Sequence, residues 1–92
     1  AYLYAFADAM VKSAVQHGIS EEDALTLFCQ TMIGSAKMLL RRDKTPAELI
    51  DAVCSPGGAT IEAMRVLEAR DLYGMLAEAS DKCIARAYEL GK

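Results

Sequence analysis

The chain has 92 residues, with 10 basic and 13 acidic side chains and a hydrophobic fraction of 53%. This length fits one domain and excludes a complete dinucleotide-dependent enzyme, because a Rossmann domain needs strands, glycine-rich turns and more residues. The net charge of −3 argues against nucleic acid or an anionic membrane as a partner, and no apolar run reaches the roughly 18 residues of a membrane span. Because so small a domain has little interior, we expect part of its apolar surface to be buried against another chain.

Cysteine and histidine are too sparse to indicate a metal site or a histidine-based triad. The thiols of Cys29, Cys54 and Cys83 are odd in number and form no Cys-x-x-Cys pair, which predicts reduced cysteines and a cytoplasmic protein. The single histidine, His17, has no clustered ligands and stands at an expected helix end, where the helix dipole favours it.

The first half of the chain predicts two helices. Over residues 1–17 the polar side chains recur every four residues on one stripe, so most of this helix is expected to be buried. Gly18 suits the left-handed position that ends a helix. Ser20 then suits an N-cap, followed by three acidic residues that favour the positive end of the dipole, and the apolar spacing continues to about Arg41.

The second half predicts three more helices and no strand. A short helix starts at Thr45-Pro46-Ala47-Glu48, a capping box with proline in the first position, and stops before Ser55-Pro56. Ser55 is expected to cap a fourth helix with Pro56 as its first residue, and a fifth starts near Asp71. The sequence therefore predicts an all-α bundle of about five helices.

The segment Ser55-Pro56-Gly57-Gly58-Ala59-Thr60 is unusual for a helix start. Two glycines in a first turn would cost roughly 1 kcal/mol each against alanine, so helix stability does not explain them. Glycine leaves N–H groups accessible, and a helix N-terminus offers free donors and a partial positive charge, so the segment predicts an anion site. The absence of a neighbouring lysine favours a carboxylate over a phosphate. A plain turn between two helices is the alternative.

The same segment resembles a known family signature. Residues 51–64, Asp-Ala-Val-Cys-Ser-Pro-Gly-Gly-Ala-Thr-Ile-Glu-Ala-Met, together with Val66-Leu67-Glu68, resemble the signature of pyrroline-5-carboxylate reductases. The resemblance extends through Gly34–Leu40 and Thr45–Leu49 back to Ala1-Tyr2. It implies that residues 1–92 are the helical dimerisation and substrate-binding domain of such an enzyme, an interleaved two-fold homodimer, without its N-terminal Rossmann domain. Further assembly of dimers stays open.

The resemblance also implies a reaction, the reduction of 1-pyrroline-5-carboxylate to L-proline by hydride from NADPH or NADH in the full-length enzyme. The present residues are not expected to bind the cofactor tightly or to be active alone. The substrate carboxylate would lie against the loop of Ser55, Gly57, Gly58, Ala59 and Thr60. The Thr60 hydroxyl would orient the ring nitrogen or help deliver its proton, which solvent could equally supply. Ser55 would bind the ligand or cap the helix.

Two other functions are suggested by parts of the sequence. Hydroxyacid dehydrogenases carry a catalytic lysine followed four residues later by asparagine; Lys37 suggests that motif, but Arg41 follows it and the chain has no asparagine. A non-catalytic helical interaction module would have no need of accessible amides at Gly57-Gly58. Asp43 is a candidate for an acidic residue that some reductases carry in this loop, with a solvated charge as the simpler interpretation.

Overall fold

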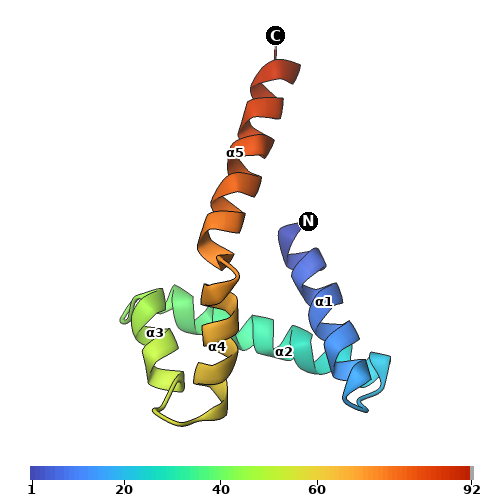
Figure 1. Ribbon diagram of the computed structural model, residues 1–92, viewed down its shortest axis with the longest axis vertical. Helices are drawn as coiled ribbons and strands as arrows, with labels where there is room; N and C mark the ends of the chain where they lie inside the picture. Colours follow the sequence, from blue (N-terminus) through green and yellow to red (C-terminus); the bar gives the residue numbers. More distant parts are fainter. Residues whose placement is uncertain (92) are drawn as a thin grey trace. The chain divides into compact units, whose positions relative to one another are not determined.

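The computed structural model describes residues 1–91 and contains five α-helices and no strand over that range. They are α1 (Tyr2–Gln16), α2 (Glu21–Leu40), α3 (Pro46–Val53), α4 (Ala59–Ala69) and α5 (Leu72–Leu90) (Figure 1). The chain divides into two compact units, residues 1–46 and the residues from 47 onward. The predicted all-α fold with five helices is confirmed.

The end of α1 follows the predicted stop signal. Gly18 has a φ of +94°, the left-handed conformation that costs glycine little. Its N–H donates to the Val15 carbonyl at 3.1 Å, and the Ile19 N–H donates to the Ala14 carbonyl at 3.1 Å. These two bonds make a Schellman motif, which satisfies two carbonyls that the helix end would leave free.

The start of α2 is capped as the sequence predicts. The Ser20 hydroxyl accepts the Asp23 N–H at 3.2 Å, and all three acidic residues lie in the first turn. Within the first unit α1 packs against α2, where Ala7, Val11 and Ala24 are buried.

An aromatic pair adds to this contact. The rings of Phe6 and Phe28 stand 5.6 Å apart, tilted by 46°. Small buried residues and one aromatic pair make a thin core, so the first unit buries little of the apolar surface of α1.

A two-residue break separates α4 from α5 in the second unit (Figure 1). Asp71 caps α5 from a left-handed conformation, with φ 60° and ψ 50°, and its carboxylate accepts the Gly74 N–H at 3.2 Å. A Cβ added at Gly74 would lie 2.1 Å from a carboxylate oxygen of Asp71. Glycine at position 74 therefore makes room for the side chain that caps the helix.

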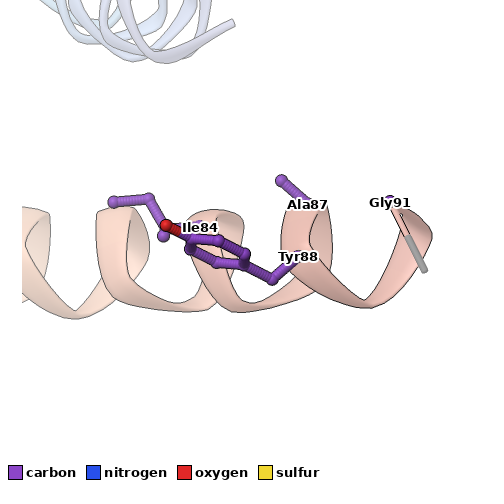
Figure 2. Close-up of a pocket in the computed structure, with 4 residues that line it drawn as sticks. All are labelled: Ile84, Ala87, Tyr88 and Gly91. Carbon is purple, nitrogen blue, oxygen red and sulfur yellow. The ribbon is translucent and has the colours of Figure 1, made fainter.

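Large apolar side chains remain exposed in both units. Tyr4 on α1 is 83% exposed and Tyr88 on α5 is 75% exposed. Figure 2 shows the Tyr88 ring lying along α5 toward Ile84, one turn earlier, on a face that also includes Ala87 and Gly91. Over residues 1–91 no helix combines the length and the apolar character needed to cross a membrane.

Candidate functional site

The segment before α4 is a β-turn, which corrects the predicted helix start. The Gly58 N–H donates to the Ser55 carbonyl at 3.0 Å, with Pro56 and Gly57 at the two central positions. Gly57 has a φ of +77°, as the third residue of a type II turn requires. Ser55 is therefore not the N-cap, Pro56 is not the first helical residue, and the two glycines lie outside the first helical turn.

Each glycine of this turn has a local reason to be glycine. Gly57 needs a positive φ that L side chains adopt only with strain. Gly58 is the N-cap of α4, and a Cβ on it would lie 2.9 Å from the Ser55 hydroxyl oxygen and 3.1 Å from the Ser55 carbonyl oxygen. Because both glycines precede the first residue of α4, their low helix propensity does not indicate a ligand.

The first turn of α4 offers hydrogen-bond donors. Helix N–H groups in the first turn have no carbonyl four residues earlier inside the helix, and Gly58 has no side chain with which to cap them. The donors are the amides of Ala59, Thr60 and Ile61. The Gly58 amide, expected as a donor to the ligand, instead closes the turn. Ile61, the third residue of α4, is not among the loop residues named from the sequence.

Two hydroxyl groups belong to the same short segment. Ser55 and Thr60 are both exposed, Ser55 beside the Gly58 backbone and Thr60 at the second position of α4. No charged side chain occurs between Ser55 and Ile61, and Glu62 in the next position is paired with Arg65. The segment thus presents neutral donors at the positive end of a helix, a combination suited to a singly charged anion.

The other candidate side chains have simpler roles. Asp43 pairs with Arg41 at 3.1 Å, and both side chains are more than half exposed, as a solvated pair would be. Lys37 is exposed in the last turn of α2, where the helix dipole stabilises a positive charge. His17 is the C-cap of α1, with its Nδ1 2.8 Å from the Ser13 carbonyl oxygen.

Within residues 1–91 no three histidine, cysteine, aspartate or glutamate side chains gather closely enough to hold a metal ion.

The chain matches one family of known proteins over nearly its whole length. Residues 1–90 match the family described as pyrroline-5-carboxylate reductase dimerisation. Over 92 residues the chain is 42% identical to pyrroline-5-carboxylate reductase of Escherichia coli and 37% identical to pyrroline-5-carboxylate reductase 3 of Xenopus laevis. All of this chain is covered in both alignments, but only 34% of each relative, so the chain spans about a third of their length.

Solved structures agree with the sequence matches. The Streptococcus pyogenes 1-pyrroline-5-carboxylate reductase superposes with a TM-score of 0.91 at 40% identity, covering 94% of this chain and 33% of that one. A Plasmodium falciparum pyrroline carboxylate reductase with NADP bound gives a TM-score of 0.95 at 27% identity, covering 99% of this chain and 35% of that one. These structures share the five-helix arrangement over a third of their chains.

Proposed function

The chain belongs to the pyrroline-5-carboxylate reductase dimerisation family, and on that premise we propose that it serves an enzyme that reduces 1-pyrroline-5-carboxylate to L-proline. Residues 1–92 would make up the helical dimerisation and substrate-binding domain. Support comes from full-length relatives that carry this activity in their names and that match the whole of the chain.

The cofactor would be held mainly outside these residues. A dinucleotide fold places the pyrophosphate on a glycine-rich turn between a strand and a helix, and the described residues contain five helices and no strand. The chain by itself does not fit a dinucleotide. A nicotinamide cofactor, NADPH or NADH, would supply the hydride in the complete enzyme; a relative with NADP bound supports the phosphorylated form.

The observation that carries the proposal is the uncapped N-terminus of α4 behind the Ser55–Gly58 turn. There the amides of Ala59, Thr60 and Ile61 would donate to the substrate carboxylate. A carboxylate needs only such neutral donors and the helix dipole, whereas a phosphate site usually adds a lysine. The site would therefore bind and orient the substrate by its charged end.

The two hydroxyls would act beside that carboxylate. Thr60 would hydrogen-bond the ring nitrogen and hold its proton in place, since a protonated imine accepts hydride more readily than a neutral one. Ser55 does not cap α4, so its hydroxyl would be available to hydrogen-bond the ligand.

The protein would act as a homodimer in the cytoplasm. The thin core around Ala7, Val11 and Ala24 and the exposed apolar side chains of α1 and α5 support burial against a second copy. An interleaved two-fold arrangement would bury more than about 2,000 Å², the range of obligate dimers. The three cysteines, odd in number and without a Cys-x-x-Cys pair, support a reducing compartment.

An activity assay on the full-length enzyme tests this function. We expect 1-pyrroline-5-carboxylate to be reduced while reduced nicotinamide cofactor is consumed, and L-proline to appear in equal amount. Cofactor oxidation without L-proline, or no turnover with either NADPH or NADH, would contradict the proposal.

A further inference from the structure

We draw no further inference here: the strongest candidate, the apolar face of α5 formed by Ile84, Ala87, Tyr88 and Gly91, is an unpartnered helix surface, and nothing in the structure shows what covers it beyond the dimerisation already proposed.

Discussion

Replacing Ala59 with proline in the full-length enzyme removes one proposed carboxylate donor with little disturbance of the fold. Position 59 is the first residue of α4, where proline is well tolerated because the N–H has no partner inside the helix. The preceding residue, Gly58, has φ −82° and ψ 170°, an extended conformation compatible with a following proline. The turn itself is closed by the Gly58 N–H, which Ala59→Pro leaves in place.

The expected effect of Ala59→Pro follows from the lost hydrogen bond. A bond from an amide to a charged group contributes about 1.5–3 kcal/mol, which corresponds to a rise of roughly 10- to 150-fold in KM for 1-pyrroline-5-carboxylate. Because the proposed site would hold the carboxylate equally in the substrate complex and the transition state, kcat should change little. Steady-state kinetics on Ala59→Pro and on the control Ala59→Gly, which keeps the N–H, measure this.

A second measurement separates the carboxylate from the rest of the ligand. L-proline should inhibit Ala59→Pro less than the parent enzyme, while prolinamide, which lacks the carboxylate, should inhibit both enzymes to the same degree. Circular dichroism and thermal unfolding establish that the variant is folded. A folded Ala59→Pro enzyme with unchanged KM and unchanged L-proline inhibition would refute the placement of the carboxylate on α4.

Four further predictions concern the same domain. Thr60→Val should lower kcat/KM about 10-fold through loss of one hydrogen bond, and Thr60→Ser should retain most activity; equal kinetics for the two variants would contradict a role for the hydroxyl. Gly58→Ala should lower the free energy of unfolding by about 1 kcal/mol in urea titrations, because the new Cβ would press on the Ser55 hydroxyl and carbonyl oxygens. Adding Ser55→Ala to that variant should recover part of the loss, because it removes the hydroxyl contact. Gly74→Ala alone should leave the free energy of unfolding nearly unchanged, because the loss of the Asp71 cap offsets the gain in helix propensity. In an Asp71→Gly background, which has no cap to lose, the same change should raise the free energy of unfolding by about 1 kcal/mol. An equal effect in both backgrounds would show that the cap is unimportant. In sedimentation experiments the isolated chain should be a dimer at micromolar concentration, and a folded monomer would contradict the proposed interface.

Helix boundaries with a single strong signal could be predicted from the sequence. The Ser20 hydroxyl is suited to capping the start of α2, and Gly18 is suited to the left-handed position that ends α1. The structure shows both residues in these roles. Pro46 likewise begins α3 as expected. These ends depend on neighbouring residues alone, so no knowledge of packing was needed.

The start of α4 could not be fixed in the same way, because proline has two local uses. A φ near −65° suits both the first position of a helix and the second position of a type II turn, so Pro56 alone does not distinguish them. The distinguishing signal was Gly57, since glycine directly after proline favours the turn. The predicted anion site stays a prediction, and its expected donors move from Gly58, whose N–H closes the turn, to Ala59 and the residues after it.

The left-handed Asp71 was also beyond prediction. N-cap residues are usually extended, and the sequence showed only a side chain able to cap. Gly74 explains how this conformation fits, because the Asp71 carboxylate occupies the space that a Cβ at position 74 would take. Asparagine and aspartate tolerate this region better than other side chains because they bond locally.

The break at Asp71 also has a consequence for how the domain can change its sequence length. In one continuous helix each residue advances the side chains by about 100°, so an insertion anywhere would rotate every face that follows. The left-handed conformation of Asp71 interrupts this regular rotation between α4 and α5. A residue gained or lost at the break itself would thus leave the hydrogen bonds inside α4 and α5 intact, whereas one within either helix would rotate every side chain that follows it in that helix.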